Sequence, residues 1–453
     1  MFCCNKSTGK GKRAGLSRDS GMMRSNITFR LIILIFLEYA VWGAYLTSLG
    51  RYLGSIGLGS QVKWFIAMQG IVSFFMPPLM GILADRHIQA QKVLSICHAF
   101  AGVFMAGAGI YCLSHSGVPE FTPLFVLYSI SVAFFMPTIA LANSVSYSAL
   151  TKEGKDKVKS FPPIRMFGTI GFICSMLATN WLKVGGVAMQ DSYTQLISSG
   201  IISLVLAAYS LTMPPCETKR AEGRQSLVEA FNLKAFSLFK NSQFSIFFIF
   251  SVLLGASLQI TNGYANMFLG AFGEDPAFAG TFAVKNSNAL ISISQISETF
   301  CILLIPFFLN RFGIKKVMLV SMFAWVLRFG LLGLGNPAMP GVILFILSCI
   351  IYGVAFDFFN IAGSLYLEKN TTPDIRSSAQ GIFMLMTNGF GATFGTLAAG
   401  LVMDATVFKV SNPSWSTAWF IFAGYAFVVG IAFMFLFKDP AKNDNGHFDK
   451  SKA

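Results

Sequence analysis

Charged side chains interrupt the apolar stretches of this chain at only five positions, and these are the first candidates for chemistry. They are Glu38, Arg165, Glu298, Arg328 and Asp357. A charge at membrane depth is costly, so it is a functional candidate by default. A carboxylate in such surroundings needs either a partner or a proton. Glu298 and Asp357 are therefore candidates for binding and releasing a proton.

Polar and aromatic side chains accompany three of these charges at helical spacing, so that each set shares one helix face. The sets are Arg165, Thr169 and Phe172; Gln259, Asn262 and Asn266; Gln295 and Glu298; and Tyr352, Phe356, Asp357 and Asn360. Amides match the edge of a base, aromatic rings offer stacking faces, and charged groups can bond vicinal hydroxyls. The sets suit a polar, uncharged ligand with a flat ring. The alternative for any single amide is a hydrogen bond between helices.

Two further polar residues are weaker candidates. Glu38 precedes Trp42 and Tyr45 in the first apolar stretch. Three roles are open for it: lining a cavity, pairing with Arg328, or only packing against its neighbours. A lone histidine such as His98 is more often structural than a proton site. The 4 histidines of the chain show no metal spacing, and no nucleophile–base set or nucleotide-binding glycine motif stands in a suitable context. We expect no metal site, no cofactor and no enzyme activity.

The composition shows which elements must position these residues. Only 12% of the residues are charged and 54% are hydrophobic, whereas a soluble domain has about 25% charged residues. This excludes a soluble enzyme, a disulfide scaffold and a disordered chain. Twelve apolar stretches lie near residues 31–49, 64–83, 93–113, 124–150, 161–182, 196–213, 244–268, 289–309, 317–334, 342–367, 378–403 and 415–437. They are apolar on every face, so they predict membrane-spanning helices rather than barrel strands.

The basic residues predict how these spans are oriented. If both termini share one side, 27 of the 34 Lys and Arg residues lie in the tails and loops of that side. Five lie in the opposite loops, and Arg165 and Arg328 lie within spans. By the positive-inside rule both termini are cytoplasmic. The net charge of +14 is thus an orientation signal and does not indicate nucleic-acid binding.

The chain divides into two similar halves. A polar segment separates six spans from six, and the segments 132–135 and 354–357 (VAFF and VAFD) resemble each other at the same place in each half. Such a repeat is typical of transporters with two related bundles. We expect a cytoplasmic tail at 1–30, helix bundles at 31–213 and 242–437, a cytoplasmic linker at 214–241 and a second cytoplasmic tail at 438–453.

Two glycine-containing segments carry further expectations. Gly81 to Arg86 (GILADR), followed by Lys92, resembles the signature of the major facilitator superfamily between its second and third spans. The resemblance implies that Asp85 and Arg86 act in gating, since the Asp can pair with basic groups or cap a neighbouring helix. The segment Gly389 to Gly395 lies within an apolar span and predicts close helix packing.

Longer motifs carry a closer resemblance. They are Phe161–Phe172 (FPPIRMFGTIGF), Leu258–Asn262 (LQITN), Ser294–Thr299 (SQISET), Tyr352–Asn360 (YGVAFDFFN), Ser377–Gly381 (SSAQG) and Thr387–Gly391 (TNGFG). These motifs resemble those of the bacterial proton-linked nucleoside permeases, the nucleoside:H⁺ symporter family of the major facilitator superfamily. The resemblance runs from about Phe29 to Phe437.

The resemblance implies roles for individual residues. The positions that match a central nucleoside site are Arg165, Thr169, Phe172, Gln259, Asn262, Gln295, Glu298, Tyr352 and Phe356. Asp357 matches the position implicated in proton coupling, and Glu298 is a second candidate for that role. Asn266 and Asn360 are further candidate cavity residues. Glu38 departs from the neutral Gln of the family, and an added carboxylate there could alter coupling or pH dependence.

These observations predict an all-α integral membrane protein with the major facilitator fold. We expect a monomeric, proton-coupled symporter that imports nucleosides across the inner membrane by alternating access. One alternative is a sugar or oligosaccharide:H⁺ symporter of the same fold, although the amides favour a base edge. The other is a non-transporting membrane sensor, for which the two tails are too short to hold an output domain. An integral membrane enzyme would need a His- or Ser-centred cluster, and none is visible.

Overall fold

The computed structural model describes residues 16–115, 118–216 and 233–438. In the first half, the helices are α1 (Leu16–Gly43), α2 (Leu49–Ser55), η1 (Gly59–Gln61), α3 (Val62–Arg86), α4 (Ala90–Ser114), α5 (Phe121–Phe135), α6 (Thr138–Lys152), α7 (Lys157–Trp181), η2 (Met189–Asp191) and α8 (Thr194–Ser210). The strands β1 (Lys183–Val184) and β2 (Val187–Ala188) pair as a short antiparallel hairpin.

All the regular secondary structure in the described residues of the second half is helical. Its helices are η3 (Leu233–Lys240), α10 (Ser242–Ala271), η4 (Phe272–Glu274), α11 (Pro276–Ala279), α12 (Phe282–Lys285), α13 (Ser287–Leu334), α14 (Val342–Asn370), α15 (Pro373–Met384), η5 (Leu385–Gly391), α16 (Ala392–Met403), η6 (Asp404–Phe408) and α17 (Trp415–Leu436). The all-α prediction is confirmed.

The predicted spans lie on these helices. In the described residues, 9 helical stretches are long and apolar enough to cross a membrane. One of them, α13, contains two predicted spans, and its backbone leaves the helical conformation at Gly313 (φ 77°). The predicted spans at 31–49 and 196–213 correspond to α1 and to the shorter apolar helix α8. The twelve predicted spans are therefore consistent with the structure.

Local sequence explains where the helices differ from the predicted stretches. The stretch 124–150 is divided between α5 and α6 around Pro137, which has no backbone N–H to donate to the preceding turn. The first stretch ends early, at Gly43, before a turn leads into α2. The stretch 378–403 contains the π-helical turn η5, a distortion that is frequent at functional sites.

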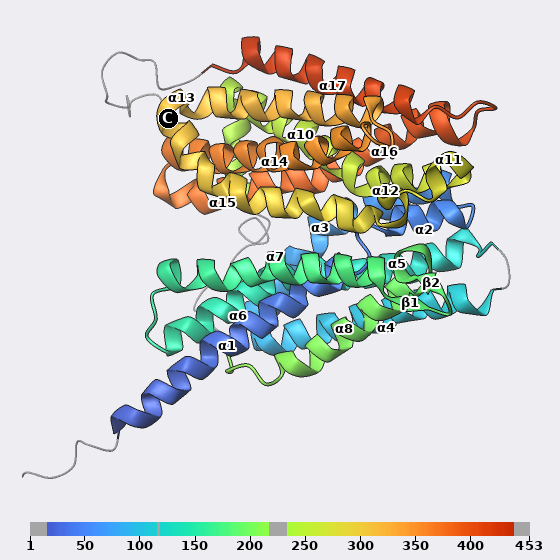
Figure 1. Ribbon diagram of the computed structural model, residues 1–453. Helices are drawn as coiled ribbons and strands as arrows, with labels where there is room; N and C mark the ends of the chain where they lie inside the picture. The colour runs from blue at the N-terminus through green and yellow to red at the C-terminus, as the bar shows by residue number, and fades with distance from the viewer. Residues whose placement is uncertain (1–15, 116–117, 217–232, 439–453) are drawn as a thin grey trace, which may run out of the picture.

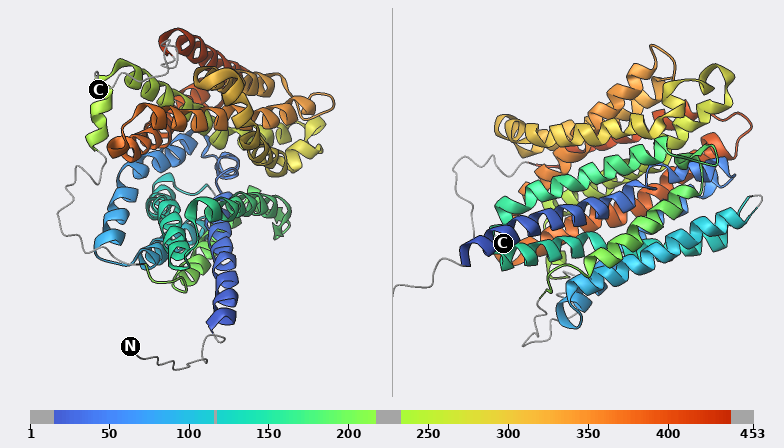
Figure 2. Two further views of the ribbon diagram at one scale, coloured as in Figure 1. Left: turned by 90° about the vertical axis from the view of Figure 1, so that its left-hand side faces the viewer. Right: turned by 60° about the horizontal axis from the view of Figure 1, so that its bottom comes forward.

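The long helices run side by side in two groups (Figure 1). We call α1–α8 the first helix group and α10–α17 the second; α3 packs against α16 along the boundary between them. The described chain starts and finishes at the same end of the molecule, which we call the tail end (Figures 1 and 2). The short elements α2, α11, α12, β1 and β2 gather at the opposite end (Figure 1).

Glycines let α10 and the η5–α16 segment approach closely in the second group. A Cβ added to Gly255 would overlap the carbonyl oxygen of Thr387, and one added to Gly391 would lie 2.7 Å from the Val252 carbonyl oxygen. A Cβ on Gly395 would overlap Ala256. Because these neighbours are mostly backbone, they cannot move aside cheaply. The close packing predicted for Gly389 to Gly395 is confirmed.

We expect Gly255→Ala to lower the thermal midpoint of the detergent-solubilised protein, because the new methyl group must push α10 away from η5. Overpacking of this kind typically costs about 1–3 kcal/mol. Gly424→Ala in α17 is the matched control, since a Cβ there meets nothing within 4 Å. Equal midpoints for the two variants would contradict the assigned contact.

Candidate functional site

Arg165 on α7 is held by an aromatic ring of α1. Its Cζ atom lies 4.0 Å from the centroid of the Tyr39 ring, the geometry of a cation–π contact. Gly168, one turn further along α7, makes this approach possible, since a Cβ there would lie 2.6 Å from the Tyr39 ring. The ring partly compensates the loss of water around the guanidinium group.

Glu298 brings an opposite charge to Arg165 from the other helix group. The two side chains interact electrostatically, and their helices α7 and α13 are in contact. On the same face of α7, Phe172 is buried and meets the Trp42 ring edge-on at a centroid distance of 6.3 Å. The charges predicted in the fifth and eighth spans therefore lie together at the boundary between the helix groups.

Two aromatic rings of α14 lie close to a second arginine, from α13. The rings of Tyr352 and Phe356 stack at a centroid distance of 5.8 Å and an interplanar angle of 12°. The Tyr352 hydroxyl lies beside Gln295 of α13. Arg328 lies with its Cζ atom 4.6 Å from the Tyr352 ring centroid and donates a 2.6 Å hydrogen bond to the Ser348 carbonyl oxygen. Three spans thus converge around one aromatic stack.

Asp357 is the buried charge with the least compensation. Its side chain is 5% exposed, and its Oδ2 atom is buried and has no hydrogen-bond partner among the described residues. The group that acts on it electrostatically is another carboxyl group, Glu298. A buried carboxylate without donors is unfavourable. This arrangement suits a carboxyl group that takes up and releases a proton.

The amides predicted to line the site have different surroundings. Asn262 donates a 3.4 Å hydrogen bond to the Gln259 Oε1 atom, so these two side chains lie together on α10. Asn360 donates to the Phe356 carbonyl oxygen of its own helix at 3.1 Å. Thr169 is half-buried on the face of α7 that carries Arg165. Asn262 and Gln259 retain further donor and acceptor capacity for a ligand.

Asn266 belongs to a different network, at the end of the molecule away from the tails. It donates to Asn288 Oδ1 at 2.7 Å, and the hydroxyl of Ser287 donates to its Oδ1 at 2.6 Å. Thr47 of the first group donates to the same Asn288 oxygen at 2.8 Å, and Asn288 donates to Thr179 at 3.2 Å. Asn266 therefore forms hydrogen bonds between helices, which was the alternative to a cavity role.

Hydrogen bonds to backbone oxygens extend this network across the groups. Arg51 of α2 pairs with Asp191 at 2.5 Å and donates to the Val284 carbonyl oxygen of α12 at 2.9 Å. Gln190 donates to the carbonyl oxygen of Lys285 at 3.1 Å. The first group therefore contacts the second through backbone oxygens as well as side chains.

A second cluster of charges joins α3 to η6 at the same end. Asp404 pairs with Lys63 at 2.5 Å and Lys409 at 2.9 Å, and accepts a hydrogen bond from Ser60 at 2.8 Å. Sequence reasoning missed this cluster because it counted Lys63 and Lys409 only as loop charges. One signal in the sequence could have revealed the cluster. It is Asp404, an acidic residue directly after an apolar stretch and between two basic loops. These contacts join the two helix groups at the end away from the tails.

The predicted gating residues lie at the tail end. Asp85 is exposed in the last turn of α3, and Arg86 ends that helix. A Cβ added to Gly81 would meet nothing within 4 Å, so this glycine makes no close helix contact here. The gating role of Asp85 and Arg86 stays a prediction.

Glu38 pairs with His98, not with Arg328. The Glu38 Oε2 atom lies 2.8 Å from His98 Nε2, and its Oε1 accepts from the Thr138 hydroxyl at 2.6 Å. Both side chains are buried, with Glu38 1% exposed and His98 0%. The sequence left open a cavity position, a pair with Arg328 or a packing role for Glu38. In the structure, Glu38 packs within the first helix group.

The hydrogen bonds also indicate how many protons the Glu38 and His98 side chains hold together. The Ser203 hydroxyl donates to the His98 carbonyl oxygen at 2.9 Å. His98 Nδ1, 3.0 Å from the same hydroxyl oxygen, must therefore be the donor in that contact. The contact between Nε2 and Glu38 needs one more proton, carried by either group. In both forms the pair has no net charge.

The fold and these buried charges define a multi-pass membrane transporter. The family model described as "Nucleoside H+ symporter" matches residues 25–442. The chain is 43% identical over 416 residues to the nucleoside permease NupG of Escherichia coli (strain K12), covering 91% of this chain and 96% of the relative. It is 44% identical over 423 residues to the xanthosine permease of the same organism, covering 92% and 98%.

A solved structure agrees with these relatives. The crystal structure of the nucleoside transporter NupG superimposes with a TM-score of 0.83 at 42% identity, covering 91% of this chain and 100% of that chain. The protein belongs to the nucleoside H⁺ symporter family. It is a transporter of the major facilitator fold and not an enzyme, as the sequence predicted. The alternative of a non-transporting sensor is set aside.

Loss of the Asp404 cluster should open the end away from the tails. We expect Asp404→Asn to raise the population of molecules open at that end about ten-fold, the effect of about 1.4 kcal/mol. The measurement is the distance between spin labels on Ser55→Cys and Ala277→Cys, in a variant without native cysteines. The control is Glu368→Gln, whose 3.8 Å pair with Arg376 lies within the second group. An unchanged distance distribution would show that Asp404 does not hold this end closed.

The pairing of Glu38 with His98 predicts strong coupling between their substitutions. Glu38→Ala and His98→Ala should each lower the thermal midpoint, because each leaves a buried polar partner unsatisfied. The double variant should lose less than the sum, with a coupling of about 1–3 kcal/mol. Glu368→Ala with Arg376→Ala provides the exposed comparison, for which the two shifts should add. Additive shifts for Glu38 and His98 would contradict the direct contact between these side chains.

Proposed function

We propose that this protein is a proton-coupled symporter that imports nucleosides across the inner membrane as a monomer. The observation that carries the proposal is Asp357, a buried carboxyl group with one oxygen that has no hydrogen-bond partner among the described residues. Glu298 acts electrostatically on both Asp357 and Arg165. The relatives named nucleoside permease and xanthosine permease support nucleosides as the substrate class. The predicted bundles at 31–213 and 242–437, joined by a linker at 214–241, are the moving parts.

The proposed substrate site lies between the two helix groups. Tyr352 and Phe356 present a stacked aromatic face to the base, which favours flat rings. Gln259, Asn262 and Gln295 supply amides for the base edge. Arg165 and Glu298 are charged groups that can bond the ribose hydroxyls, and Thr169 and Phe172 complete the face of α7.

The proposed coupling depends on Asp357 and Glu298. When Asp357 holds a proton, the two carboxyl groups no longer repel each other, and the site can accept a neutral ligand. Release of the proton restores the repulsion and favours release of the nucleoside. Asp357 thus links the protonation of the site to its occupancy, while Asp85 and Arg86 act at the tail end.

The orientation of the molecule assigns sides to this cycle. The positive-inside rule places the two tails in the cytoplasm. The polar contacts of Arg51, Asn288 and Asp404 then close the periplasmic end. In this arrangement the protein exchanges substrate with the cytoplasm, and breaking those contacts gives the alternate, periplasm-facing state.

Asp357→Asn should abolish nucleoside accumulation driven by a pH gradient, because the amide cannot take up and release a proton. Exchange of labelled for unlabelled nucleoside across the membrane should persist, since exchange needs no net proton movement. The measurement is uptake of labelled uridine into membrane vesicles with an imposed pH gradient. Glu368→Gln, an exposed carboxylate on the same helix, is the control and should accumulate uridine normally.

The same vesicles test the substrate class. Nucleosides should compete with labelled uridine, whereas free bases and sugars should not. Competition by sugars alone would favour the sugar symporter instead. Unchanged pH-driven accumulation by Asp357→Asn would remove Asp357 from the coupling mechanism.

A further inference from the structure

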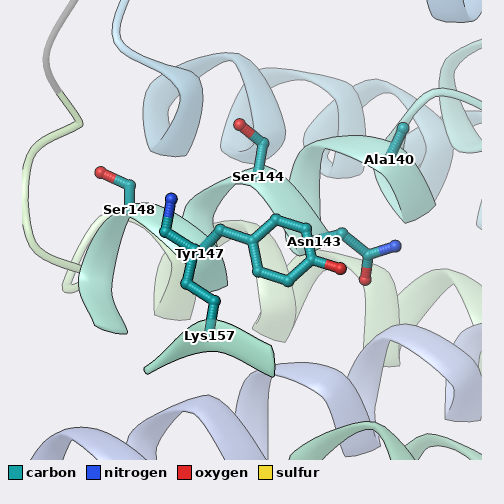
Figure 3. A pocket seen from close by; sticks show the side chains of 6 residues that line it. All are labelled: Ala140, Asn143, Ser144, Tyr147, Ser148 and Lys157. Carbon is teal, nitrogen blue, oxygen red and sulfur yellow. The ribbon is translucent and has the colours of Figure 1, made fainter. Parts of the chain in front are cut away.

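A polar cavity lies outside the proposed substrate site, between α6 and the start of α7. It is a wide, open hollow with a volume of about 460 Å³. Figure 3 shows its lining side chains, which are Ala140, Asn143, Ser144, Tyr147, Ser148 and Lys157. Five of the six are polar or carry a polar group, in a protein where polar side chains are scarce.

The accessible face of α6 is polar, which indicates that it faces water. Ser144 and Tyr147 are exposed, while the opposite face of the helix buries Leu141, Ala142 and Val145. A helix surface that met lipid would carry apolar side chains, because hydrocarbon offers polar groups no hydrogen bonds. The polar face therefore lines an aqueous space that reaches α6.

An aromatic contact joins the lining of this cavity to α7, the helix that carries Arg165 of the proposed substrate site. The Tyr147 ring lies 4.6 Å, centroid to centroid, from the ring of Phe161 on α7. Phe161 precedes Arg165 by about one helical turn, and Lys157 precedes it by about two, or roughly 12 Å. Since α7 starts at the tail end (Figure 1), the cavity lies on the tail side of the proposed site.

The lining groups match the parts of a nucleoside. Tyr147 offers a ring on which a base can stack. The Oδ1 atom of Asn143 is buried without a hydrogen-bond partner among the described residues, so it is available to accept from a base edge or a sugar hydroxyl. Ser144 and Ser148 can bond ribose hydroxyls as donors or acceptors. The set resembles the proposed substrate site in chemistry but lacks a carboxylate.

We propose that this cavity is a second nucleoside site, which a substrate occupies between the central site and the tail side of the membrane. The proposal rests on the proposed function. Because the cavity has no carboxylate of its own, occupancy there is independent of the proton on Asp357. A nucleoside that has left the central site is held near the exit, so the cavity sets the affinity that the carrier shows from the tail side.

Transport measured from each side of the membrane tests this site. Tyr147→Leu and Asn143→Ala should each raise the KM for uridine about 3- to 10-fold in inside-out vesicles, which present the tail side, as expected for loss of one stacking or hydrogen-bonding contact. In right-side-out vesicles the KM should stay within about two-fold of the wild type. Tyr147→Phe keeps the ring and should restore the wild-type KM.

Tyr111→Leu is the matched control, since this tyrosine lies near the end of α4 away from the tails, with its ring 4.2 Å from the His115 ring at an angle of 49°. The KM of this variant should not change on the tail side. Gel filtration of each variant in detergent confirms that it is folded. Wild-type KM values for both cavity variants from the tail side would overturn the proposal, as would equal increases from both sides. If the wild type itself transports no nucleoside, the proposed function fails instead.

Discussion

The cost of placing charge in hydrocarbon is the constraint on which this structure depends. Most charged groups within the apolar stretches have specific partners: Tyr39 and Glu298 for Arg165, and Ser348 and Tyr352 for Arg328. His98 and Thr138 compensate Glu38. Asp357 is different, since one of its oxygens has no donor among the described residues. Other buried polar atoms of the described residues also lack a partner, but the Asp357 oxygen is the one that belongs to a carboxyl group, where a proton can make up for the deficit.

The two ends of the molecule are held by different chemistry. At the end away from the tails, amides and ion pairs join the helix groups over short distances, such as 2.5 Å between Lys63 and Asp404. At the tail end, the helix α6 presents a polar face to a cavity. This asymmetry is what alternating access requires, because one end must hold while the other admits water and substrate.

The sequence alone predicts the helices and the helix faces that carry polar groups, because both follow from local periodicity. It also placed Arg165, Glu298 and Asp357 on faces that could meet. The partners of Glu38 and Asn266 were beyond its reach, since His98 and Asn288 approach them only through the packing of separate helices. The same holds for the Asp404 cluster, whose members are separated by more than 300 residues of chain.

The neutral Glu38–His98 pair has an electrical consequence. If Arg165 and Glu298 also cancel, the charges left within the apolar stretches are Arg328 and Asp357. With Asp357 ionised they sum to zero, and with Asp357 protonated the spans carry one positive charge. The substrate-loaded carrier is then drawn inward by a negative interior, by about 2.3 kcal/mol for each 100 mV, while the empty carrier returns without electrical work. In the proposed mechanism, membrane voltage therefore adds to the pH gradient in driving accumulation.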